Sequence, residues 1–234
     1  KFTISKLSIV KYTKKSLGII YFFLFVALSS CAQPLNQKKK FTSQDTLRGS
    51  ITPERAWWDV YSYNISVTPS YTTKTISGSN EIIFNVLIGG RKKKMQIDLQ
   101  QPMEIDSILF NGKLIKQFSR NGNVYIIDFG IFDFPESGKS NNTPESTQQK
   151  IKIYYQGKPR EAVTPPWDGG WIWAKDAKGR PWMTVACQGL GASVWYPCKD
   201  HQGDEPDNGA TLQVRVPDTL IAVGNGHLVN KESK

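Results

Sequence analysis

The residues that offer chemistry gather between Trp182 and Asn208, which read WMTVACQGLGASVWYPCKDHQGDEPDN. Cysteines, aromatic residues, glycines and a run of acidic groups stand together there, a mixture that no regular strand or helix requires. Gly189 and Gly191 let the backbone turn or approach a ligand closely, and the amide of Gln188 both donates and accepts hydrogen bonds. The stretch predicts a recognition loop, with a glycine-rich loop packed under two aromatic residues as the alternative.

The histidine content limits metal chemistry. A catalytic zinc site needs three protein ligands, typically including two histidines one helical turn apart with a glutamate between them. This chain has two histidines, His201 and His227, and neither sits in an HExxH motif. We therefore expect no catalytic residue and no metal ligand in this chain. His201 beside Asp200 and Asp204 lacks the carboxylate spacing of a calcium loop, so we expect a hydrogen-bonded acidic turn.

Other reactive groups have structural interpretations. Cys187 and Cys198 are expected to be buried thiols, with a disulfide between them as the alternative. Asp168 and Asp176 could be the paired catalytic carboxylates of a glycosidase. They lie in DGG and DAKG turns, however, where aspartate stabilises loops through local hydrogen bonds.

A longer pattern identifies a family resemblance. The run CQGLGASVWYPCKD, Cys187 to Asp200, resembles the signature in the N-terminal domain of the zinc aminopeptidases of the aminopeptidase N and leukotriene-hydrolase type. The flanking runs PPWDGGWIWAKDAKGRPW and DHQGDEPDNG, with VPDTLIAVGNGHL, are similar to the bacterial lipoprotein branch of that family. The likeness extends more weakly back to about Trp57.

The resemblance implies a function. In that family the glutamine corresponding to Gln188 reaches from the β-domain into the active-site cleft and helps to hold the N-terminal residue of the peptide. Gly189 and Leu190 follow as lining residues. It also implies a parent enzyme with zinc held by ligands outside this chain, peptide as substrate, and a C-terminal catalytic domain of the same protein as partner. The chain is then expected to be a fragment of a longer protein.

The N-terminus predicts export and anchoring. Residues 1–30 carry lysines up to Lys15 and then an apolar run, Leu17 to Leu28, that matches a signal peptide and is short for a membrane span. The sequence Leu28-Ser29-Ser30-Cys31 resembles a bacterial lipobox, which predicts lipid attachment at Cys31. The alternatives are ordinary cleavage with Cys31 as a chance residue, or a retained anchor. Residues 31–53 read as a polar, flexible tether. The expected location is the bacterial cell envelope, lipid-anchored and periplasmic or outer-membrane-associated.

The net charge does not indicate nucleic acid. The formal charge is +10, but residues 1–30 supply five lysines and no acidic residue, which leaves +5 for the rest. Charges scattered over some two hundred residues do not make a phosphate-binding stripe.

The elements that must position the loop are strands. Period-two alternation predicts half-buried strands in residues 59–67 and 75–86, and again around residues 95–99, 105–110, 124–129, 151–155, 212–216 and 220–223. Asn111-Gly112 and Asn121-Gly122 predict tight turns, and residues 136–149 a surface loop.

The prediction is therefore an all-β domain over residues 54–234, a large antiparallel β-sandwich with a saddle-like, multi-sheet elaboration. Trp167, Trp171, Trp173 and Trp182 either fill its core or line a cleft. The alternative to the peptidase domain is a non-catalytic surface lipoprotein that binds glycan or peptide through this aromatic-rich face.

Overall fold

The computed structural model describes residues 40–87, 94–130, 132, 134 and 148–233. The chain divides into two compact units, Lys1–Phe41 and Thr42–Lys234, and the fold below is that of the second. Within the described residues, no helix has the length and apolar character needed to cross a membrane. The predicted signal peptide and Cys31 lie outside the described residues.

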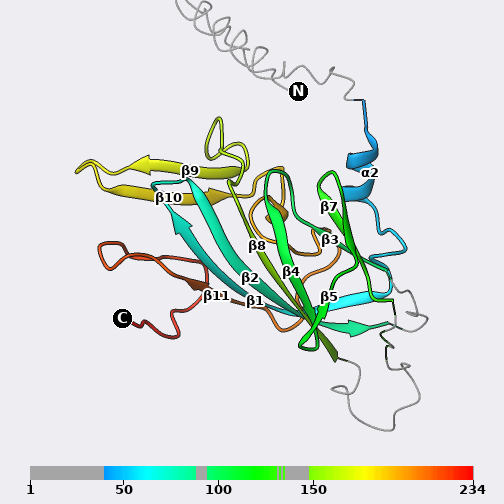
Figure 1. The fold of residues 1–234 in the computed structure, drawn as a ribbon. Coiled ribbons are helices and arrows are strands. Elements are labelled where there is room, and N and C mark those ends of the chain that lie inside the picture. Colours follow the sequence, from blue (N-terminus) through cyan, green and yellow to red (C-terminus); the bar gives the residue numbers. More distant parts are fainter. Residues whose placement is uncertain (1–39, 88–93, 131, 133, 135–147, 234) are drawn as a thin grey trace, which may run out of the picture. The chain divides into compact units, whose positions relative to one another are not determined.

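The largest element is a six-stranded sheet (Figure 1). Its neighbouring strands pair antiparallel, except that the edge strand β11 runs parallel to β1. In spatial order the strands are β11 (Ala210–Val214), β1 (Trp58–Ser70), β2 (Thr75–Val86), β8 (Gln148–Gly157), β4 (Glu104–Phe110) and β5 (Lys113–Ile115).

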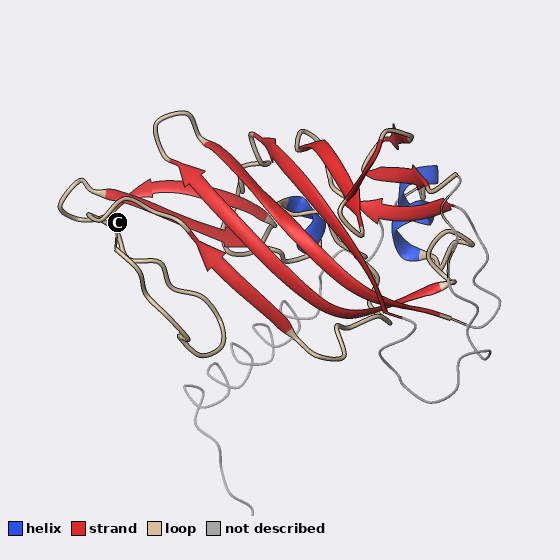
Figure 2. Cartoon of the chain, turned by 60° about the horizontal axis from the view of Figure 1, so that its bottom comes forward, coloured by secondary structure: helices blue, strands red, loops and turns tan. Residues whose placement is uncertain are grey.

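Two smaller sheets complete the domain. One has the order β3 (Lys94–Asp98), β7 (Val124–Asp128), β6 (Phe118–Asn121), and the other is the hairpin of β9 (Gly170–Lys175) and β10 (Pro181–Ala186). Figure 2 shows the long strands of the six-stranded sheet in front and the short 3-10 helix η2 (Ala192–Val194) behind them. The predicted all-β, multi-sheet architecture is confirmed.

Bulges adjust the alternation that the sequence shows. In β1 the register shifts between Val60 and Ser62, so Tyr61 is an extra residue opposite β2. Trp58 and Val60 are buried before it, and Tyr63 is buried after it. A bulge re-aims the side chains that follow it. The period-two alternation of residues 59–67 predicts that Tyr61 shares one face with Tyr63, and the bulge makes that prediction wrong.

The predicted hairpin turns are confirmed. Phe110 pairs with Lys113, and the two residues between them, Asn111 and Gly112, have φ values of 46° and 81°. Two positive φ values match the turn that Asn-Gly favours, because its twist suits the flanking strands. In the second hairpin Asn121 pairs with Val124.

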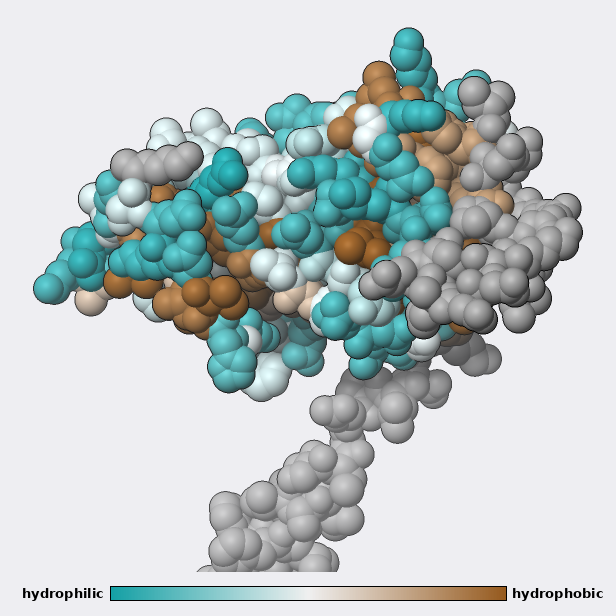
Figure 3. Space-filling model, turned by 90° about the horizontal axis from the view of Figure 1, so that it is seen from below, coloured by the Kyte–Doolittle hydropathy of each residue, from teal (hydrophilic) through white to brown (hydrophobic). Residues whose placement is uncertain are grey.

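The core lies on one face of the six-stranded sheet and is rich in aromatic residues. Trp57 meets Phe84 and Phe129 edge-on, with ring centroids 6.0 and 6.1 Å apart. Figure 3, viewed from below, shows the sheet's other face as mostly hydrophilic or neutral, with scattered apolar spots. Such one-sided burial explains why the strands alternate in sequence.

Some segments differ from the sequence-based expectation, among them β9 and β10, which the alternation did not predict. Helix α2 (Ser43–Gly49) falls within the predicted tether, and the compact unit begins at Thr42, before residue 54. The predicted strand 220–223 does not form, since Ile221 and Val223 are 81% and 87% exposed and no strand pairs with this segment among the described residues. The predicted loop 136–149 lies mostly outside the described residues, and Gln148 and Gln149 belong to β8.

Candidate functional site

The predicted recognition loop is a tight turn that follows β10. The amides of Leu190 and Gly191 both donate to the carbonyl of Cys187, at 3.2 and 2.9 Å. Gly189 has φ 69°, a conformation that L-residues with side chains rarely adopt. Gln188 and Gly189 are exposed, whereas Leu190 is half-buried. The turn therefore presents the Gln188 amide to solvent.

Two side chains from distant segments hold the main chain of this turn. Gln100 donates from Nε2 to the carbonyl of Leu190 at 2.6 Å and to Oγ of Ser193 at 2.9 Å. Arg48, in α2, donates from Nη1 to the carbonyl of Gly189 at 3.0 Å. The side chain of Gln188 is exposed, whereas the carbonyls of the next two residues, Gly189 and Leu190, are both held by hydrogen bonds.

Close packing leaves no room for larger residues at the base of the turn. Gly191 has φ 81°, and a Cβ there would collide with the carboxylate of Asp200. That carboxylate accepts a hydrogen bond from Oγ of Ser193 at 2.6 Å. A Cβ at Gly169 would meet the side chain of Leu190 at 2.9 Å. The glycines here serve close approach as well as turning.

Behind the turn lies a buried ion pair. The guanidinium of Arg55 donates from Nη2 to Oδ2 of Asp98 at 2.5 Å, and both side chains are almost fully buried. Asp98 also accepts from Nε2 of Gln96 at 3.0 Å and from the amide of Asp200 at 2.9 Å. Burial raises the pKa of Asp98, and Arg55 is the largest opposing influence. This pair fixes the far end of the loop to β3.

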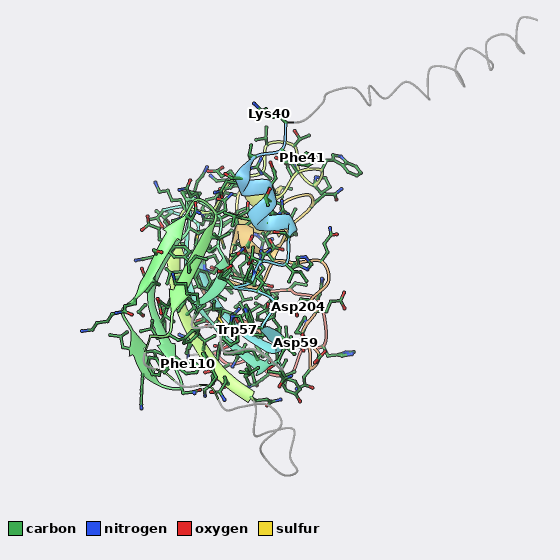
Figure 4. The ribbon with its side chains drawn as sticks, turned by 90° about the vertical axis from the view of Figure 1, so that its right-hand side faces the viewer. Lys40, Phe41, Trp57, Asp59, Phe110 and Asp204 are labelled. Carbon is green, nitrogen blue, oxygen red and sulfur yellow. The ribbon has the colours of Figure 1, made fainter. Side chains whose placement is uncertain are left out.

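The acidic turn after the loop is also tied to the core. Asp204 forms a buried ion pair with Lys199, whose Nζ donates to the carbonyl of Trp58 at 2.5 Å. Asp59 lies beside Asp204 (Figure 4), and burial, followed by the charge of Asp204, raises the pKa of Asp59. His201 accepts at Nδ1 from the amide of Gly203 at 3.0 Å. The expected hydrogen-bonded acidic turn is confirmed.

The described residues do not assemble a metal site. Within them, no group of three or more histidine, cysteine, aspartate or glutamate side chains lies close enough to hold an ion. The described residues therefore offer zinc no fitting set of ligands.

Cys187 and Cys198 are free thiols with no disulfide between them, and the expected burial holds fully only for Cys198. Cys198 is buried and Cys187 half-buried. Burial raises the pKa of each thiol, and that of Cys198 rises well above its ordinary value. A raised pKa leaves little thiolate near neutral pH, so these groups are poor nucleophiles.

Two of the four tryptophans have the expected core role, and the other two lie on the surface. Trp171 and Trp173 stack with ring centroids 5.1 Å apart on the core side of the β9–β10 hairpin. Trp182 and Trp167 are 59% and 75% exposed. Because side chains alternate across a strand, the inner face of the hairpin is core and the outer face is open to solvent.

Asp168 and Asp176 have the predicted turn-stabilising contacts. Asp168 accepts from the amides of Val163 and Thr164 at 3.0 and 2.8 Å. Asp176 accepts from the amides of Lys178 and Arg180 at 2.8 and 2.9 Å. These backbone hydrogen bonds lower the pKa of both carboxyl groups, which suits a structural role and does not suit a proton donor.

Comparison with solved structures identifies the fold. The chain aligns with an M1 zinc metallopeptidase, crystallised as an E323A mutant bound to L-arginine, with a TM-score of 0.55 and 18% identity. The fold is similar to part of an M1 zinc metallopeptidase. The alignment covers 77% of this chain and 37% of that enzyme, so the chain spans well under half of its length.

Other solved structures give weaker alignments. An M1 zinc metallopeptidase from Deinococcus radiodurans matches with a TM-score of 0.46 and 16% identity, over 68% of this chain and 32% of that one. Yeast LTA4 hydrolase in complex with bestatin matches with a TM-score of 0.49 and 15% identity, over 76% and 28%. No family model and no curated protein matches the chain.

Sequence reasoning placed the turn but missed the residues that hold it. Gln96, Asp98 and Gln100 alternate with apolar residues in β3 and just beyond it, so they read as a solvent-facing row, yet all three are buried. Their residue types could have indicated burial, because none of the three is a lysine or a glutamate, the residues that usually cover exposed sheet faces. Arg48 gave no such signal.

Proposed function

We propose that residues 54–234 are the N-terminal, substrate-cleft-forming domain of a zinc aminopeptidase that removes N-terminal residues from peptides. The observation that carries this proposal is the turn after β10, where Gln188 is exposed while the peptides that follow it are held by Arg48 and Gln100. The likeness of the fold to part of an M1 zinc metallopeptidase supports it.

The chemistry of Gln188 suits the N-terminal region of a peptide. Its amide oxygen accepts from an α-ammonium group, and its amide nitrogen donates to a carbonyl. Neither amide function titrates, so Gln188 itself adds no pH dependence to the contact around neutrality. Gly189 adds no side chain that would block approach, and nothing lies within 4 Å of the position its Cβ would take.

In this proposal the zinc ion is bound by another domain. The zinc ligands lie in a C-terminal catalytic domain of the same protein, outside this sequence, and that domain is the partner against which the turn closes the cleft. The domain described here contributes binding and orientation of the peptide.

The proposal places the enzyme in the bacterial cell envelope, periplasmic or outer-membrane-associated. Cys31 carries the lipid, residues 1–30 are removed as a signal peptide, and the polar segment beginning at residue 31 links the lipid to the domain. The lipobox-like Leu28-Ser29-Ser30-Cys31 supports this anchoring.

Substitution of Gln188 in the full-length enzyme tests the proposal. Gln188→Ala removes a hydrogen bond to a charged group, worth about 1.5–3 kcal/mol, so kcat/KM for peptides is expected to fall about ten- to a hundredfold. The melting temperature should barely change, because the side chain is exposed. Gln188→Glu should retain binding through pairing with the α-ammonium group and change the pH dependence. Gln202→Ala, another exposed glutamine, is the matched control.

Unchanged kcat/KM in both Gln188 variants would remove Gln188 from the site. Complete absence of peptidase activity in the full-length protein would instead favour a non-catalytic surface lipoprotein. Exposed Trp167 and Trp182 would then be the groups to test for stacking on glycan or peptide.

A further inference from the structure

Helix α2 lies before the segment that resembles the aminopeptidases, yet it is built firmly into the domain. Its first turn has a capping box, in which Thr42 and Asp45 exchange hydrogen bonds between side chain and backbone. At its other end the buried Arg55 donates from Nη1 to the carbonyls of Arg48 and Ser50, at 2.8 and 2.9 Å. The backbone at Arg48 is therefore fixed by the same guanidinium that pairs with Asp98.

Arg48 connects this helix to the turn of Gln188. Its Nη1 reaches the carbonyl of Gly189, a residue 141 positions away in sequence, at 3.0 Å. The Gly189 position is otherwise open, because no atom lies within 4 Å of where its Cβ would be. Glycine also has the widest backbone freedom. A charged donor on its carbonyl thus restrains a peptide whose residue has the widest choice of backbone conformations.

Gln100 holds the next peptide, and the two contacts act together. Gln100 donates to the carbonyl of Leu190, and its own backbone amide donates to Ser193 at 2.9 Å. Gln100 therefore fixes the base of the turn from the sheet side. Arg48 holds the tip of the turn from the side of α2, at the carbonyl of Gly189, the residue that follows Gln188.

We propose that Arg48 is a positioning residue for the peptide-binding turn, setting the direction of the Gln188 side chain through the Gly189 carbonyl. The proposal rests on the function proposed above for Gln188. It assigns to α2, which falls within the segment predicted as a tether, a role in substrate binding.

Hydrogen exchange on the full-length protein tests the contact without relying on activity. Arg48→Met keeps the aliphatic stem and removes the donors, so the amides of residues 187–191 are expected to exchange about tenfold faster. Amides of β1 and β2 should be unchanged and serve as the reporter of global stability. Arg48→Lys retains a cationic donor and should return exchange toward the wild-type rate. Arg215→Ala, which removes an exposed arginine just after β11, is the control.

Kinetics then test whether the contact acts through Gln188. Arg48→Met is expected to raise KM for peptide substrates about three- to tenfold with little change in kcat, and Arg48→Lys to restore most of the loss. In the double variant with Gln188→Ala, the loss should be no larger than that of Gln188→Ala alone, because the two residues serve one interaction.

The outcomes separate the two proposals. Unchanged exchange at 187–191 in Arg48→Met, or a uniform rise across all strands, overturns the positioning role. Additive kinetic losses in the double variant also overturn it. Faster exchange confined to the turn, with no kinetic effect of Gln188→Ala, leaves the contact standing and refutes the function proposed for Gln188.

Discussion

Two buried tyrosines differ in what their hydroxyl groups meet. Tyr63 accepts a hydrogen bond from the amide of Lys199 at 3.1 Å. The hydroxyl of Tyr155 is buried and has no hydrogen-bond partner among the described residues. A buried hydroxyl without a hydrogen-bond partner destabilises the fold, because it has lost its contacts with water. When a paired hydroxyl is removed, the same cost falls on the partner that is left buried without a hydrogen bond.

We therefore expect opposite effects from the same substitution. Tyr155→Phe should leave the free energy of unfolding unchanged or raise it by about 1 kcal/mol, since it removes an unpaired hydroxyl. Tyr63→Phe should lower it by about 1–3 kcal/mol, since the buried amide of Lys199 loses its acceptor. Urea unfolding at pH 7 measures both, and a larger loss for Tyr155→Phe would refute the assignment.

The pH dependence has a defined sign. Burial raises the pKa of both phenols above the ordinary value of 10.0. The folded state keeps these protons while the unfolded state loses them, so stability is expected to fall as the pH rises above about 10. Tyr155→Phe should make that decline shallower, which unfolding measured between pH 8 and pH 11 will detect.

At the scale of elements, β3 connects the core to the turn that carries Gln188. Its apolar residues, Met95 and Ile97, face the core, and its polar residues bind α2 and the loop that leads to Asp200. Beyond the exposed Lys94 the strand is therefore buried on both faces, and Asp98 on its polar side pairs with the buried Arg55.

Breaking that pair should be more damaging than replacing it. Arg55→Met leaves the Asp98 carboxylate buried without its cation and is expected to cost about 3–5 kcal/mol of unfolding free energy. The double variant Arg55→Met/Asp98→Leu should cost less than the sum of the single variants. Denaturant unfolding of the three proteins gives the coupling energy, and strict additivity would contradict a direct ion pair.

At the scale of the whole molecule, the proposed anchor would determine where the domain acts. Cys31 precedes the compact unit that begins at Thr42, so a lipid there would hold the domain close to the membrane. Cys187 and Cys198 are half-buried and buried free thiols. Cys31 is thus the cysteine on which lipid attachment is expected.

Metabolic labelling with a fatty-acid analogue tests the anchor. The wild-type protein and the control Cys187→Ser should both take up label, whereas Cys31→Ser should take up none. Full labelling of Cys31→Ser would exclude lipid attachment at this residue.

The sequence by itself determined the local structure. Alternation predicted β2, β7 and β8, Asn111-Gly112 predicted its hairpin, and glycine types predicted the turn that carries Gln188. These features depend on backbone preferences and on which side chains avoid water, and both are properties of short segments. The class of fold follows from them.

Tertiary structure alone decided how the turn is held and which polar residues are buried. Arg48 and Gln100 reach the turn from 141 and 90 positions away, so no local pattern encodes their contacts. The bulge at Tyr61 reversed a predicted face, and residues 220–223 form no strand despite a strand-like pattern. A strand needs a partner for its backbone hydrogen bonds as well as a suitable sequence, and that partner is supplied by the fold as a whole.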